Sequence, residues 1–188
     1  MTGVQTCALP IYLWKHFKRV ELSCSVDHYG ERAEWLRKGT DWGKVESNLL
    51  TFRELDFISF QLNTVFSIFN YYTIGEFYQY LKDKGIIRRE DWYHSLYLAV
   101  HPSYYCAKSL PKHLKAEAAE KAKKWADANT GDGTSLSRLV NDAINFAAES
   151  DSWDDNKEMF LQHTRSIDRI RDENFWAVFP ELNSLQES

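Results

Sequence analysis

The sequence predicts an α/β fold in which about three parallel strands are joined by crossover helices and followed by an all-helical C-terminal part. Apolar and polar residues alternate with a period of two around Val20–Val26 and Ile58–Phe66, which indicates half-buried strands. Helical periods of three to four lie between these segments, and such alternation is typical of a parallel sheet with crossover helices. From Pro111 onward the period is helical throughout.

The first predicted strand has one apolar and one polar face. Its polar face delivers Ser25 and Asp27 to the carboxyl end of the strand, just before a turn at Gly30. Ligands bind at this end of sheets built from strand–helix units, so both residues are candidate binding residues. Turn capping by Ser and Asp is the alternative. The apolar face carries Val20, Leu22, Cys24 and Val26.

A helix is expected to follow, with Thr40 or Asp41 as its N-cap and its end near Arg53. The second strand then places Ser59, Gln61 and Asn63 on a polar face. Unpaired buried polar groups cost about 1–3 kcal/mol each. This face therefore either lines a ligand cavity or is exposed to solvent.

The next helix is expected to begin at Thr73, because Thr73 and Glu76 form a capping-box pattern, and to end at Gly85. Trp92–Val100 is the third strand candidate. Three C-terminal helices follow, with a break at Gly131-Asp-Gly133 and a third start between Asp151 and Asp155. The inward side of the third helix is predicted to carry Phe160, Ile167 and Ile170.

Composition limits the classes of function. The formal net charge of the 188 residues is −4, which gives no indication of nucleic-acid binding. No apolar run approaches the ~20 residues of a membrane span. Three widely spaced cysteines do not form a disulfide framework, so a reducing, cytoplasmic location is expected. His94 and His101 lack metal-ligand spacing, and no metal site is predicted.

The end of the first strand resembles a known family. Ser25-Val-Asp27, Gly30-Glu-Arg-Ala-Glu34 and Arg37-Lys-Gly-Thr-Asp-Trp42 are similar to the fourth barrel strand and its loop in radical SAM proteins. The similarity is greatest to the twitch-domain-containing radical SAM group. It continues through Gln61–Asn70, reaches Arg171–Leu182 and covers roughly residues 12–188.

This resemblance implies the C-terminal half of a partial (β/α)6 radical SAM barrel over residues 12–110, followed by a helical cap over residues 111–188. The family holds a 4Fe–4S cluster with Cys-x3-Cys-x2-Cys, because such clusters take thiolate ligands. This chain has only Cys7, Cys24 and Cys106, without that spacing, and it lacks the family's Gly-Gly-Glu strand end. Both motifs belong to the first half of the barrel. The expected partner is therefore the missing N-terminal half of the same protein.

The resemblance also implies a site for S-adenosyl-L-methionine. Ser25 and Asp27 would hydrogen-bond to its ribose or methionyl part, and Arg37 would bind its carboxylate, with Arg32 as a weaker candidate. Arginine suits a planar carboxylate, although a surface position near a helix start is the alternative for Arg37. Asn63 would line the same cavity, unless it makes only a structural hydrogen bond.

The expected function is that of a fragment of a radical SAM enzyme. In the full-length protein, reductive cleavage of S-adenosyl-L-methionine would lead to hydrogen abstraction from an unknown substrate, a peptide or a small molecule. This chain would supply one wall of the cavity and be inactive alone. The alternative is a stand-alone α/β interaction or small-molecule-binding module without redox chemistry. Residues 1–11 resemble translated sequencing adapter, so they are expected to be a non-native leader.

Overall fold

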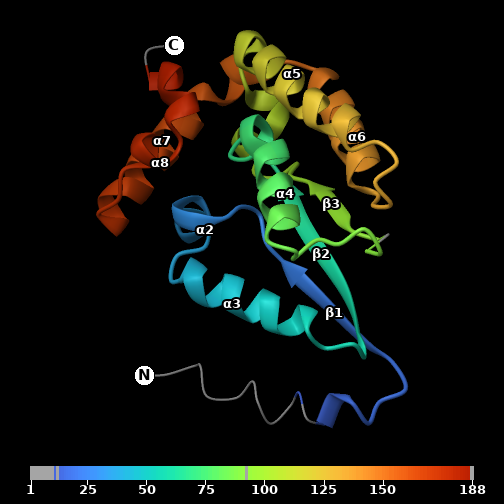
Figure 1. The fold of residues 1–188 in the computed structure, drawn as a ribbon. Helices are drawn as coiled ribbons and strands as arrows, with labels where there is room; N and C mark the ends of the chain where they lie inside the picture. Colours follow the sequence, from blue (N-terminus) through green and yellow to red (C-terminus); the bar gives the residue numbers. More distant parts are fainter. Residues whose placement is uncertain (1–10, 12, 92, 187–188) are drawn as a thin grey trace.

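The computed structural model describes residues 11, 13–91 and 93–186. The expected leader, apart from Ile11, and Trp92 at the expected start of the third strand lie outside these residues. Figure 1 shows a small sheet with α3 and α4 on the same side of it. The helices α5 and α6 lie together beyond one end of α4, and α7 and α8 lie on the other side of the molecule.

Three parallel strands form the sheet, as the sequence predicted. They are β1 (Val20–Ser25), β2 (Ile58–Phe66) and β3 (Ser95–Leu98), in the order β1-β2-β3. In register, Ser25 pairs with Asn63, and Asn63 pairs with Ser95. The third strand is shorter than expected. Within the described part of the chain, the outer edges of β1 and β3 have no neighbouring strand.

The crossover helices begin and end largely where the sequence places them. Helix α3 (Trp42–Arg53) has Asp41 as its N-cap, and the Asp41 side chain accepts a hydrogen bond from the backbone N–H of Lys44 at 3.1 Å. Helix α4 (Ile74–Asp83) follows the 3₁₀ turn η1 (Tyr71–Thr73). It ends just before Gly85, which has a φ of 70° that suits glycine.

The C-terminal part is helical, as expected. It contains α5 (Lys112–Ala128), α6 (Leu136–Ala148), α7 (Trp153–Arg171) and α8 (Phe175–Val178). Short 3₁₀ turns are η2 (Ser103–Tyr105), η3 (Ala107–Ser109) and η4 (Pro180–Gln186). In the described residues, no helix combines the length and the apolar character that crossing a bilayer requires.

A single buried cluster joins the sheet region to the C-terminal helices. Where α2 (Gly30–Leu36) meets α8, the rings of Trp35, Phe175 and Phe179 lie 4.9–5.3 Å apart. The Arg32 guanidinium donates two hydrogen bonds to the Glu181 carboxylate, at 2.5 and 2.8 Å. The C-terminal segment is therefore attached to the turn and helix that follow β1.

Two expectations about local structure were wrong, and one helix was not predicted. The Thr73 side chain does not cap α4, because its hydroxyl instead hydrogen-bonds to His28 and Arg32. The side chain of Ile170 is 79% exposed, since the buried face of α7 passes through Phe160 and points away from Ile170. Gly30, with a φ of 59°, does form the expected turn, but α2 begins there without having been predicted.

Candidate functional site

The polar face of the sheet carries a row of hydrogen-bonded side chains. The Asn63 amide donates to the Ser23 hydroxyl at 2.6 Å, and the Gln61 amide donates to Asn63 Oδ1 at 3.1 Å and to the Ser95 hydroxyl at 3.0 Å. This row links all three strands on the face opposite the buried side chains of β2. Ser23 and Ser25 are exposed, so part of this face is open to solvent.

Three of the predicted site residues meet at the carboxyl end of β1. Ser25, Asp27 and Arg37 line one niche of about 60 Å³. Arg37 donates to Asp27 Oδ2 from Nε at 3.1 Å and from Nη2 at 2.8 Å. The side chain of Arg37 is 50% exposed, whereas that of Asp27 is 14% exposed. The exposed hydroxyl of Ser25 makes no hydrogen bond within the described part of the chain.

Asp27 joins the carboxyl end of β1 to β2 and to the loop that follows β2. Its Oδ1 accepts a hydrogen bond from the backbone N–H of Val65 at 2.8 Å, which extends the pairing of β1 and β2 past the last residue of β1. The backbone carbonyl of Asp27 accepts from the Asn70 amide at 3.1 Å. Both carboxylate oxygens of Asp27 therefore already accept hydrogen bonds. Through one of them, Asp27 holds the Arg37 guanidinium at this edge of the sheet.

The other two candidates lie in different surroundings. Asn63 stays within the hydrogen-bonded row on the sheet and does not line the niche with Ser25. Arg32 points to the C-terminal segment, where Glu181 binds its guanidinium, and the guanidinium also donates to the Thr73 hydroxyl of η1. The candidate anion-binding group at this end of the sheet is thus Arg37.

A buried histidine supports the turn behind this site, and no local sequence pattern marks it as a site residue. His28 is 2% exposed, its Nε2 lies 2.9 Å from the Thr73 hydroxyl, and its ring stacks on Phe77 at 5.5 Å. Burial, and to a smaller extent the charge of Arg32, lower the pKa of His28 to about 3. The imidazole is therefore neutral at physiological pH and acts as a packed polar anchor.

The described residues offer no ligand set for an iron–sulfur cluster. They contain no group of three or more His, Cys, Asp or Glu side chains placed to hold a metal ion. Burial raises the pKa of the Cys24 thiol to about 11, which keeps it protonated, and Cys106 is buried. A 4Fe–4S cluster therefore does not fit the part of the chain that the structure describes.

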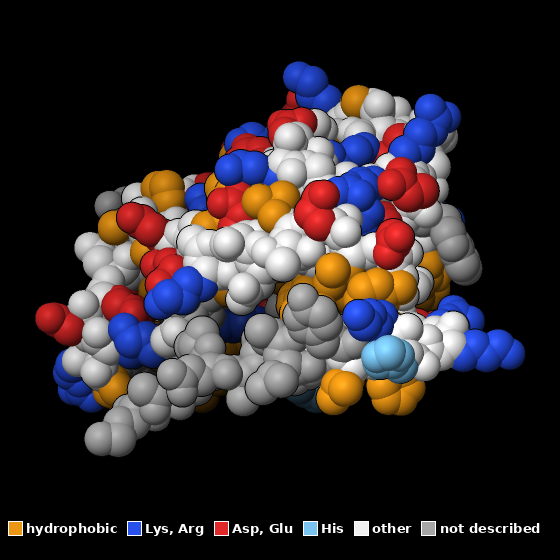
Figure 2. Space-filling model, turned by 60° about the horizontal axis from the view of Figure 1, so that its bottom comes forward, with side chains coloured by type: hydrophobic (Ala, Val, Ile, Leu, Met, Phe, Trp, Pro, Cys, Tyr) orange, Lys and Arg blue, Asp and Glu red, His pale blue; other side chains and the backbone are white. Residues whose placement is uncertain are grey.

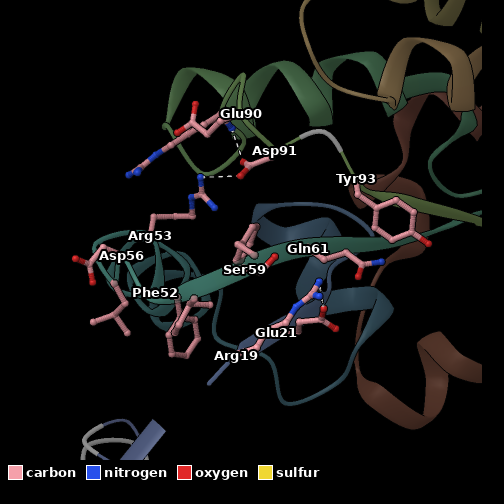
Figure 3. Close-up of a pocket in the computed structure, with 14 residues that line it drawn as sticks. Arg19, Glu21, Phe52, Arg53, Asp56, Ser59, Gln61, Glu90, Asp91 and Tyr93 are labelled. Carbon is pink, nitrogen blue, oxygen red and sulfur yellow. Dashed lines mark hydrogen bonds and ion pairs between the residues drawn. The ribbon is translucent and has the colours of Figure 1, made fainter. Parts of the chain in front are cut away.

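A larger cavity lies at the other end of the strands. It has a volume of about 530 Å³ and is formed by the starts of β1 and β2, the end of α3 and the segment before β3 (Figure 3). Arg53 and Asp91 form an ion pair of 2.9 Å on its wall, with each side chain 7% exposed. The Arg53 guanidinium also lies over the Phe60 ring, 4.9 Å from its centroid. Because separate segments contribute to it, no local sequence motif pointed to this cavity.

Comparison with known proteins does not assign the chain. No family model, no curated protein and no solved structure matches it significantly. The site therefore has to be interpreted from its own residues.

Proposed function

We propose that this chain is the C-terminal part of a radical SAM enzyme and that the carboxyl end of β1 forms one wall of its cavity for S-adenosyl-L-methionine. The observation that carries the proposal is the meeting of Ser25, Asp27 and Arg37 in one niche at that end of β1. In parallel sheets with crossover helices, this is the end at which ligands bind.

Within this proposal the residues have separate roles. The exposed Ser25 hydroxyl and the free donors of the half-exposed Arg37 guanidinium suit the hydroxyl and carboxylate groups of S-adenosyl-L-methionine. Asp27 acts through Arg37 as a positioning residue, because both of its carboxylate oxygens are already hydrogen-bonded. Asn63 contributes to the polar wall of the sheet.

We assign the remaining parts of the site to the N-terminal half of the full-length protein. A niche of about 60 Å³ is far smaller than the 300–1,000 Å³ of ordinary small-molecule sites, so this chain alone does not enclose the ligand. S-adenosyl-L-methionine would supply the radical chemistry of hydrogen abstraction. The cluster that activates it would be held by the N-terminal half of the full-length protein.

A second candidate function is a small-molecule-binding module without redox chemistry. The observation that favours it is the cavity of about 530 Å³ at the opposite end of the strands, which lies within this chain. A ligand in that cavity would need neither Arg37 nor a cluster.

The first proposal is tested by adding S-adenosyl-L-methionine to the ¹⁵N-labelled chain and following its NMR spectrum. The expected result is weak, saturable shifts confined to the amides around Ser25 and Arg37. Arg37→Gln should abolish them, because it removes the charge that faces the ligand carboxylate. Arg138→Gln, which removes a more exposed guanidinium from an ion pair on α6, is the matched control and should leave them unchanged.

Shifts that are absent up to the solubility limit of the ligand would count against the proposed wall. Shifts that persist in Arg37→Gln would place the ligand elsewhere on the chain.

A further inference from the structure

We propose that the cavity of about 530 Å³ at the N-terminal ends of the strands binds a small zwitterionic molecule of the amino-acid type with an apolar side chain. The cavity lies at the opposite end of the sheet from Ser25 and Arg37, so this inference does not depend on a site for S-adenosyl-L-methionine. It rests on three features of the cavity wall: donors that are unpaired or held only in an exposed ion pair, carboxylates without partners among the described residues, and a partly apolar surface.

The donors can receive a carboxylate. Arg53 is bound to Asp91, but its Nε–H is buried and has no acceptor among the residues described. The exposed hydroxyl of Ser59 makes no hydrogen bond in the same part of the chain. Arg19 pairs with Glu21 on the opposite wall, and both side chains are more than half exposed. Exposed ion pairs contribute little, so Arg19 can exchange its partner for a ligand carboxylate.

The carboxylates can receive an ammonium group. Asp56 and Glu90 line the cavity and make no hydrogen bond or ion pair within the described residues. Asp91, in contrast, is fully engaged, because Arg53 binds one of its oxygens and the backbone N–H of Arg88 donates to the other at 2.7 Å. A wall that carries both signs of charge disfavours a phosphate or another multiply charged anion, and it suits a ligand that carries one charge of each sign.

Part of the cavity wall is apolar. Side chains at the end of α3 and the start of β2 contribute Phe52, Leu55 and Ile58. In the view of Figure 3, Phe52 and Ser59 lie below Arg53 and Asp91. The volume falls in the range of about 300–1,000 Å³ that is common for small ligands, and a mixed apolar and polar lining is typical of such sites.

The test compares three ligands of nearly equal size by isothermal titration calorimetry of the full chain. Phenylalanine carries both charges, N-acetylphenylalanine only the negative one, and phenylalaninamide only the positive one. Phenylalanine should bind about tenfold or more tightly than either derivative, because each derivative leaves one set of cavity groups unpaired.

Two variants locate the binding. Ser59→Ala should weaken binding of phenylalanine, and Asp56→Asn should weaken it while leaving N-acetylphenylalanine unaffected. The matched controls are Ser47→Ala on the exposed side of α3 and Glu120→Gln on the surface of α5, neither of which lines the cavity.

Equal affinities for the three ligands, or no saturable heat up to about 10 mM, would overturn the inference. So would a loss of binding in Ser47→Ala as large as in Ser59→Ala. Arg37→Gln separates this inference from the proposed function, because it should abolish the NMR response to S-adenosyl-L-methionine and leave the affinity for phenylalanine unchanged.

Discussion

Replacement of Asp27 separates a structural role from a ligand-binding role. In Asp27→Ala, the backbone N–H of Val65 loses the acceptor that it has at 2.8 Å. Because this hydrogen bond is exposed, water can replace the lost acceptor, and the loss is about 0.5–1.5 kcal/mol. The half-exposed ion pair with Arg37 adds at most about 1 kcal/mol, because water screens it. Asp27→Ala should therefore lower the free energy of unfolding by about 0.5–2.5 kcal/mol.

Asp27→Asn removes only part of this contribution. The amide oxygen of asparagine can still accept from Val65, whereas the charge that holds Arg37 is lost. The expected destabilisation is about 1 kcal/mol or less, and Arg37→Gln should give a similar value. In the double variant the two losses should not add, because both substitutions break the same ion pair.

Urea unfolding followed by tryptophan fluorescence and circular dichroism measures these differences. Asp142→Ala is the control, since it breaks an exposed pair with Arg138 on one face of α6 and should stay within about 0.5 kcal/mol of the unsubstituted chain. Stabilities of Asp27→Ala and Asp27→Asn that agree within about 0.5 kcal/mol would refute the role of Asp27 as an acceptor for Val65.

Three further substitutions, and one control, test the packing and charge of other parts of the chain. His28 binds a proton only in the unfolded state between pH 6.5 and about 3, so native stability falls as the pH is lowered through this window. His28→Phe should reduce the slope of unfolding free energy against pH by about 1.4 kcal/mol per pH unit, and an unchanged slope would contradict this. Glu181→Gln should cost about 3 kcal/mol in urea unfolding, because it removes the counter-charge of a largely buried guanidinium on α2; a cost below about 1 kcal/mol would show that the C-terminal segment is held by other contacts. Gly75→Ala should lower the thermal midpoint, because its Cβ would lie 2.6 Å from Cβ of Trp125. Gly43→Ala, which meets no atom closer than 3.5 Å, should raise the midpoint slightly, and equal shifts for the two glycines would contradict the packing argument.

Sequence patterns predicted the elements that are stabilised mainly by contacts between neighbours in the sequence. The alternation in β2 and the Asp41 cap of α3 depend on neighbours in sequence, and both appear in the structure. Helix α2 was missed because distant groups support it. The Trp35 ring packs among C-terminal aromatic rings, and the backbone carbonyl of Trp35 accepts a hydrogen bond from Arg171 at 2.8 Å.

The difference between local contacts and contacts of distant segments also explains which parts of the site could be predicted. Ser25 and Asp27 lie at a strand end that can be recognised from alternation. Arg37 was named only through the family resemblance, and it reaches Asp27 from the end of α2, which lies between them in the sequence. The pairing of Asp27 with Val65 depends on the register of two strands, and no local pattern contains it. The cavity at the opposite end combines several chain segments, so only the folded structure brings its lining together.

The central claim is that this chain forms one part of a radical SAM barrel. The most direct measurement is the sequence of the DNA upstream of the Tyr12 codon in the genome that encodes it. An open frame that continues upstream and encodes Cys-x3-Cys-x2-Cys, followed by a strand ending in Gly-Gly-Glu, is the predicted result. A stop codon in frame, followed by a functional start near Met1, would contradict the claim and leave the binding module as the better account.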